Sequence, residues 1–228
     1  CNSRWGPLQL LAGFLLAAGL LYGTGWLMVY MGWFSLKDPL PWDVAWKKAL
    51  GPSISASLVE EILFRGIFLG ICLRTFRPAT AIIVVSLLFS ALHFLQPPSN
   101  IAVFTQGEPL AEGAVYIDPG NSYSGFQLLQ AVLMRFQNIE LVLFEFVSLT
   151  AIGLILAYAR YATASLWLPI GLHTGWIFAY VSFKKISLRV PQADDTVSYL
   201  VGSNLKEGLI PMGTLALTAL LVCLLYTS

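Results

Sequence analysis

Long runs of apolar residues alternate with polar stretches along the whole chain. A membrane-spanning helix needs about 20 mostly apolar residues, and six runs are close to this length or exceed it. They are Leu8–Phe34, Ser53–Leu73, Ala79–Leu95, Leu141–Tyr158, Ala162–Phe183 and Leu209–Thr227. These runs are too long and too uniformly apolar for the strands of a membrane barrel, which alternate over about 9–11 residues. We therefore predict an all-α, polytopic transmembrane helix bundle with about six spans.

The predicted connections are short on one side of the membrane and long on the other. The short ones are Arg74–Pro78 and Arg160–Tyr161, and the long ones are Ser35–Pro52, Gln96–Glu140 and Lys184–Gly208. In the first long connection, Asp43–Leu50 is typical of a short interfacial helix. The Gln96–Glu140 loop is rich in Pro and Gly and becomes helix-like at Phe126–Phe136. Eight Lys and Arg residues on the long-loop side against four on the other favour the long-loop side as cytoplasmic.

Composition supports a lipid environment and excludes several classes of protein. The chain is 57% hydrophobic and 11% charged, whereas soluble domains are about 45–50% apolar and about 25% charged. The 13 basic and 12 acidic residues give no basic excess for nucleic acid. Cys1, Cys72 and Cys223 form no CxxC pair, which argues against a zinc knuckle or a thioredoxin-like motif. Because the chain begins at Cys1 rather than Met, we expect it to be a fragment of a longer protein.

The second apolar run carries three charged residues, Glu60, Glu61 and Arg65. One charge at the centre of a spanning helix costs about 2.5–3.5 kcal/mol, so these groups need partners. Glu61 and Arg65 are four residues apart and can pair on one face. Glu60 lies about 100° around the helix and is not fully neutralised by Arg65. Two interpretations follow: an ion pair that joins helices, or a desolvated carboxylate that acts as a general base.

The two histidines of the chain, His93 and His173, also lie in predicted spans. His93 ends the third span on the long-loop side, and Glu60 lies in the half of the second span that begins on that side. These two residues therefore share a depth. His173 lies midway along the fifth span, four residues after Pro169, which removes one helical hydrogen bond. We predict that the acid and both imidazoles meet around one intramembrane cavity that opens on the long-loop side.

The residue inventory excludes several hydrolytic mechanisms. A HExxH zinc protease needs histidines four residues apart, but these two are 80 apart. All five aspartates lie outside the predicted spans, which argues against an aspartyl protease, and no GxSG turn provides a serine nucleophile. Glutamate and histidine acting on water remain, with or without a metal. A proton-coupled transporter with a Glu60–His173 relay is a further alternative, although no internal repeat is visible.

Three motifs carry a family resemblance. Glu60–Arg65 has the form EExxxR, Phe89–His93 has the form FxxxH, and Gly153–Trp176 contains a third-motif histidine. In this order, over about Ser57–Ala179, the chain resembles the CPBP family. These CAAX-processing and bacteriocin-processing intramembrane endopeptidases, also called Abi proteins, include the type II CAAX prenyl endopeptidase.

The resemblance implies a role for each of five residues. Glu60 corresponds to the catalytic glutamate, which activates a water molecule together with His93. Glu61 and Arg65 correspond to the pair that orients it, and His173 to the histidine that stabilises the oxyanion. The resemblance implies a glutamic peptidase without a cofactor, although the family was formerly classed as metalloendopeptidases. If zinc is bound instead, Glu60, His93 and His173 are its expected ligands.

One position departs from the family pattern. The third motif usually has Asn four residues after its histidine, where this chain has Ile177. Loss of one oxyanion donor can reduce the rate about 10²–10³-fold. Either another donor replaces it, such as Trp176 or a loop group, or the activity is weak. The change keeps open an alternative function, an inactive family member that acts as a bacteriocin-immunity or scaffolding protein.

We therefore expect an intramembrane endopeptidase with one membrane-embedded domain. Its first span and interfacial segment would occupy residues 1–52, its catalytic core 53–183, and its loop and last span 184–228. The substrate would be a membrane-anchored protein or peptide, in one version prenylated, cleaved near its C-terminus. We expect the chain in a bacterial inner membrane with its active site open to the cytoplasmic side.

Overall fold

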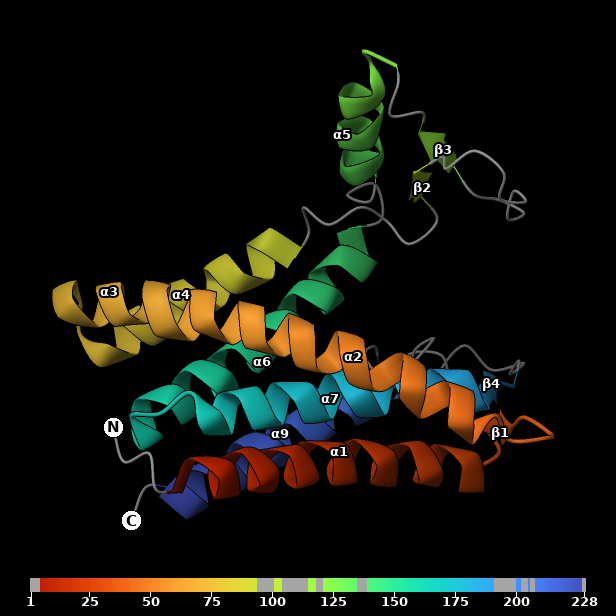
Figure 1. The fold of residues 1–228 in the computed structure, drawn as a ribbon, viewed down its shortest axis with the longest axis horizontal. Coiled ribbons are helices and arrows are strands. Elements are labelled where there is room, and N and C mark those ends of the chain that lie inside the picture. Colours follow the sequence, from red (N-terminus) through yellow and green to blue (C-terminus); the bar gives the residue numbers. More distant parts are fainter. Residues whose placement is uncertain are drawn as a thin grey trace.

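The computed structural model describes residues 5–93, 101–103, 115–117, 121–134, 139–190, 200–201, 205 and 208–226. Its helices are α1 (Gly6–Tyr30), α2 (Trp42–Glu61), the π-helical segment η2 (Ile62–Phe68), α3 (Leu69–Thr75), α4 (Pro78–His93), α5 (Ser124–Met134), α6 (Ile139–Thr163), α7 (Trp167–Ile186) and α9 (Leu209–Tyr226). The predicted all-α helix bundle is confirmed, and Figure 1 shows its long helices side by side.

Four short strands accompany the helices. Strands β1 (Phe34–Leu36) and β4 (Ser187–Arg189) pair antiparallel, with Ser35 opposite Leu188, and so join the end of α1 to the end of α7. Strands β2 (Ile101–Val103) and β3 (Val115–Ile117) pair in parallel. The second pair lies beside α5, away from the long helices (Figure 1).

Three helices in the described part of the chain are long and apolar enough to cross a membrane. They are Gly6–Tyr30, Val142–Thr163 and Leu209–Tyr226. The other expected spans form the continuous α2–η2–α3 helix, the 16-residue α4 and the buried α7, which lie alongside them. Leu15 on α1 and Leu224 on α9 are 59% and 64% exposed. Apolar side chains exposed along such helices fit a lipid surround better than water.

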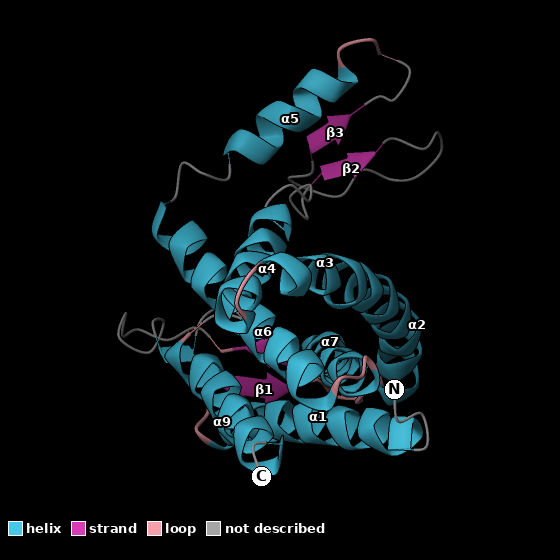
Figure 2. Ribbon diagram, turned by 90° about the vertical axis from the view of Figure 1, so that its left-hand side faces the viewer, coloured by secondary structure: helices cyan, strands magenta, loops and turns pink. Residues whose placement is uncertain are grey.

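Helix α7 lies at the centre of the bundle, between α1, α2 and α6 (Figure 2). Its residues 168–176 are all buried, as expected for a helix that is covered on every side. Two glycines allow α1 to approach it closely. A Cβ atom at Gly175 would lie 2.6 Å from the Phe14 carbonyl oxygen, and one at Gly171 would overlap the Leu10 carbonyl.

Two sequence-based boundaries are wrong. Asp43–Leu50 is not a separate interfacial helix, because α2 continues through Pro52 to Glu61. The boundary at residues 52 and 53 therefore lies inside a helix. The reason is packing: every fourth residue of α2 is buried, in a stripe of Ala45, Ala49, Ser53, Ser57 and Glu61. This stripe of mostly small residues packs against α7 on both sides of the proline.

The second error concerns the turn predicted at Arg160–Tyr161. Helix α6 continues to Thr163, and the chain reverses at residues 164–166, where Ala164 has a φ of +49°. The Ser165 hydroxyl accepts a hydrogen bond from the backbone N–H of Trp167 at 3.3 Å and so supports the start of α7. The helix predicted at Phe126–Phe136 is observed two residues earlier, as α5.

Candidate active site

The five sequence-predicted residues come from helices that are far apart in the chain. Glu60 and Glu61 end α2, and Arg65 lies in η2. His93 is the last residue of α4, and His173 lies near the middle of α7. The fold brings all five side chains together, and they form an inner buried group and an outer, partly exposed pair.

The inner group is a chain of hydrogen bonds centred on Glu61. Glu61 Oε1 lies 2.8 Å from Arg65 Nη1 and 2.8 Å from His173 Nδ1. Arg65 Nη2 donates to the Gly153 carbonyl of α6 at 3.3 Å. Glu61 and Arg65 are fully buried, and His173 is 6% exposed. Buried charges of this kind need such partners, so the pair connects α2, α6 and α7.

The outer pair consists of Glu60 and His93. Glu60 Oε2 lies 3.5 Å from His93 Nε2 and 3.8 Å from His173 Nε2. The Glu60 and His93 side chains are 22% and 19% exposed, but the Glu60 Oε2 atom that faces both histidines is itself buried and has no hydrogen-bond partner. As the helical offset predicts, Glu61 pairs with Arg65 and Glu60 lies on another side of the helix, where its Oε2 atom faces the Nε2 atoms of both histidines.

Hydrogen bonds at Nδ1 fix the tautomer of each neutral histidine. His93 Nδ1 lies 2.8 Å from the Phe89 carbonyl, which can only accept, so this nitrogen carries the hydrogen. His173 Nδ1 likewise donates to the Glu61 carboxylate. Both Nε2 atoms therefore face the same Glu60 oxygen with their lone pairs. Separations of 3.5 and 3.8 Å exceed those of good direct hydrogen bonds. This geometry suits a small hydrogen-bond donor, such as a water molecule, held between Glu60, His93 and His173.

The π-helical segment directly follows the two glutamates. The backbone N–H of Leu69 bonds to the Phe64 carbonyl five residues earlier, which is the π-helical spacing. Gly66 lies in the middle of this segment, and a Cβ atom there would already contact Leu166 at 3.6 Å. Such insertions are frequent at functional sites. The helical spacing of the sequence did not predict it.

Phe89 is a component of the cluster whose contacts the sequence did not assign. Its ring lies 4.4 Å from the Arg65 guanidinium carbon and 4.2 Å from the His93 ring. The His173 ring is 6.1 Å away, and Phe89 itself is 1% exposed. Its position four residues before His93 was the available signal, because such residues share a helix face.

Besides Arg65 Nε, buried donors without a partner lie close to the five cluster residues. Ser57 Oγ and Trp176 Nε1 are both inaccessible and unbonded. Other helix serines, such as Ser53 and Ser86, donate to a carbonyl three or four residues earlier. Because α2 and α7 run in opposite directions (Figure 1), Ser57 and Trp176 lie on the same side of the Glu61–His173 contact, about one turn away.

Ile177 is half-buried on α7, one turn after His173, and provides no polar atom. The described residues contain no three His, Cys, Asp or Glu side chains arranged to hold a metal ion. Glutamate and imidazole are nevertheless ligand types that zinc accepts.

A comparison with protein families identifies the chain. The family described as type II CAAX prenyl endopeptidase Rce1-like matches residues 42–179. The chain belongs to this family. The matched region includes Glu60, Glu61, Arg65, His93 and His173. No curated protein and no solved structure matches the chain.

The Rce1-like assignment sets the general class of the protein. At the family level it indicates a CAAX endopeptidase, and the three long apolar helices place the chain in a membrane. The matched region runs from the first residue of α2 into α7, so it contains the whole observed cluster.

Proposed function

We propose that this Rce1-like protein is an intramembrane glutamic endopeptidase that cleaves near the C-terminus of a membrane-anchored protein. The convergence of both histidine Nε2 atoms on Glu60 Oε2 is the observation that carries this proposal. A carboxylate and a neutral imidazole that face the same point can hold a water molecule and accept its proton. Both side chains are partly exposed, and the buried Glu60 Oε2 atom has no hydrogen-bond partner, so it is available to a water molecule.

The reaction begins when a water molecule binds between Glu60 and His93. Glu60 takes one proton while the water oxygen attacks the carbonyl carbon of the scissile peptide bond. A tetrahedral intermediate forms, and its carbonyl oxygen becomes an oxyanion. The proton held by Glu60 then passes to the nitrogen of the leaving amine, the C–N bond breaks, and the carboxylate is regenerated.

The inner group keeps His173 in the orientation that this reaction needs. Glu61 accepts a hydrogen bond from His173 Nδ1 and is itself fixed by Arg65. When also protonated at Nε2, His173 can donate to the oxyanion. Trp176 Nε1 and Ser57 Oγ supply further donors in place of an amide at position 177. Donors that are fixed and buried before the reaction stabilise developing charge most effectively.

The substrate that the family implies is a prenylated protein with a C-terminal CAAX sequence. A lipid anchor would hold such a substrate at the membrane and concentrate its C-terminus beside the bundle. The exposed side of Glu60 and His93 would then receive an extended peptide.

The decisive experiment compares membranes that contain the wild-type protein with membranes that contain Glu60→Gln. We expect Glu60→Gln to reduce cleavage of a prenylated CAAX peptide by about 10²–10⁴-fold, since the amide cannot accept the proton. Asp43→Asn, an exposed carboxyl on the same helix, is the matched control and should leave cleavage unchanged. Comparison of all membrane peptides in the two samples would identify the natural substrate. Equal cleavage by wild type and Glu60→Gln would overturn the proposal.

A second candidate function follows from Ile177. A chain without an effective oxyanion donor would serve as an immunity or scaffolding protein instead of a protease. In that case, Glu60→Gln and His93→Ala would both keep full function in cells. Loss of function in both variants, with normal amounts of protein in the membrane, excludes the scaffold.

The metal-free mechanism can be tested separately. We expect purified protein to contain zinc well below one atom per chain and to keep its activity in the presence of a chelator. Stoichiometric zinc that is lost in His93→Ala would show that the cluster holds a metal.

A further inference from the structure

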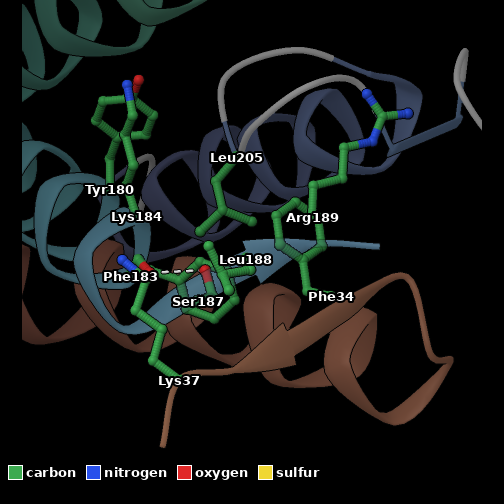
Figure 3. A pocket seen from close by; sticks show the side chains of 9 residues that line it. All are labelled: Phe34, Lys37, Tyr180, Phe183, Lys184, Ser187, Leu188, Arg189 and Leu205. Carbon is green, nitrogen blue, oxygen red and sulfur yellow. Dashed lines mark hydrogen bonds between the residues drawn. The ribbon is translucent and has the colours of Figure 1, made fainter. Parts of the chain in front are cut away.

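A pocket of about 300 Å³ lies at the end of α7 where β1 and β4 pair. Figure 3 shows its nine lining residues, which come from β1 and the residue after it, from α7, from β4 and from Leu205. Phe34 and Phe183 pack edge to face in its wall, with their ring centroids 5.7 Å apart. The volume suits a small ligand or a head group.

The pocket combines positive charge with an apolar surface. Lys37, Lys184 and Arg189 line it from three different elements, and no acidic residue is among the lining residues that the structure describes. In Figure 3 the charged ends lie at the periphery, and Phe34 and Leu188 lie between them. The whole chain has a net charge of only +1, so three cations around one pocket are a local feature.

The surroundings place this pocket at the level of lipid head groups. The nearby end of α1, Tyr30, is 86% exposed, and Trp42 and Trp46 at the start of α2 are 41% and 53% exposed. Exposed tryptophan and tyrosine at the ends of spanning helices are typical of the membrane–water interface. The same end of the bundle therefore carries an aromatic belt and the basic pocket.

We propose that this pocket binds the head group of an anionic phospholipid. The ammonium groups of Lys37 and Lys184 would contact the phosphate, and the wall formed by Phe34, Leu188 and Leu205 would contact the glycerol and the first methylene groups. A soluble anion would use the cations but not the apolar wall. Basic pockets between spanning helices are known to suit anionic lipid head groups.

The pocket is separate from the candidate active site. Lys184 follows His173 by 11 residues on the same helix, which corresponds to about 16 Å along its axis. None of the residues that line the pocket belongs to the Glu60–His93–His173 cluster. The inference therefore does not depend on the proposed protease activity and can be tested without a substrate.

The test is a lipid titration of the purified, full chain, followed by native mass spectrometry. Phosphatidylglycerol is compared with phosphatidylcholine for the wild type and for Lys37→Gln/Lys184→Gln. The matched control is Lys47→Gln/Lys48→Gln, which removes two exposed lysines of α2 that do not line the pocket. We expect tighter binding of phosphatidylglycerol by the wild type. Loss of the two pocket lysines should weaken this binding about 25-fold, at about fivefold for each cation.

A charge-conserving variant and a competing anion complete the test. Lys37→Arg/Lys184→Arg keeps both charges and should keep the lipid preference. This variant therefore distinguishes loss of charge from misfolding as the cause of weaker binding. Equal binding of the two lipids by the wild type would overturn the proposal, as would an equal loss in the control variant. Displacement of phosphatidylglycerol by millimolar inorganic phosphate would assign the pocket to a soluble anion and overturn the lipid assignment.

Discussion

Phe89 contributes two different groups to the candidate active site. Its carbonyl accepts the hydrogen bond that orients His93, and its ring covers the Arg65 guanidinium at 4.4 Å. A cation over an aromatic face gains about 0.5–2 kcal/mol, more where water is excluded. The residue therefore connects the buried ion pair with the exposed histidine.

Phe89→Leu tests this connection. The variant keeps the backbone carbonyl and most of the apolar volume but loses the aromatic face. We expect the free energy of unfolding in detergent to fall by about 1–3 kcal/mol, and cleavage to fall with it. Phe68→Leu is the control, because Phe68 packs against Phe64 in the same aromatic cluster, whereas the Arg65 guanidinium lies over the rings of Phe64 and Phe89. An equal loss of stability in both variants would contradict a particular role for Phe89.

Trp176 tests whether a buried donor replaces the amide that position 177 lacks. Trp176→Phe removes the indole N–H and keeps an aromatic side chain. If Nε1 binds the oxyanion, kcat should fall about 10²-fold with little change in KM. Trp167→Phe on the same helix, where the side chain is 44% exposed, should leave kcat unchanged. A change in KM alone would instead indicate a packing role.

Among the helices, α1 and α7 have the closest contact. Gly171 and Gly175 allow the carbonyls of Leu10 and Phe14 to lie against the α7 backbone. This contact fixes the level of α7 in the bundle, and hence the height of His173 relative to Glu61. Small residues at such positions are a common means of helix association in membranes.

A pair of glycine substitutions with opposite expected effects tests this packing. Gly175→Val places methyl groups where the Cβ atom alone would lie 2.6 Å from the Phe14 carbonyl, so stability should fall by about 1–3 kcal/mol. Gly19→Ala on α1 meets no atom within 4 Å and should raise stability by about 0.5–1 kcal/mol. Thermal unfolding in detergent measures both. Tolerance of Gly175→Val without loss of stability would mean that α1 and α7 are not closely packed.

At the scale of the whole molecule, the distribution of charge predicts which end of the bundle faces the cytoplasm. The end with β1, β4 and the basic pocket carries most of the Lys and Arg residues that the structure describes, and the opposite end carries the α3–α4 and α6–α7 turns (Figure 1). The excess of positive charge predicts that the β1–β4 end is cytoplasmic.

Cysteine labelling in intact cells tests this orientation. In a background without native cysteines, Arg74→Cys at the end of α3 should react with an impermeant maleimide from outside. Lys184→Cys should react only after the membrane is opened. Both side chains are exposed at opposite ends of the bundle, so each serves as the control for the other. The reverse pattern would invert the predicted orientation.

Much of this protein follows from its sequence alone. Apolar runs of membrane length predict the helix bundle, since a backbone in lipid must satisfy its hydrogen bonds internally. The four-residue spacing of Glu61 and Arg65 predicts their pairing, and the 100° offset predicts that Glu60 faces elsewhere. Both features depend only on local helical geometry, and the structure shows them.

Tertiary packing decided the features of the fold and the site that the sequence did not predict. The sequence placed a helix end before Pro52, but burial of small residues against α7 carries α2 through it to Glu61. The contact of the Phe89 ring with Arg65 and the gathering of three cations around one pocket involve residues that are distant in the chain. Helical periodicity fixes which residues share a face of one helix. Only the packing of helices against each other fixes which faces meet, and therefore which acid lies beside which imidazole.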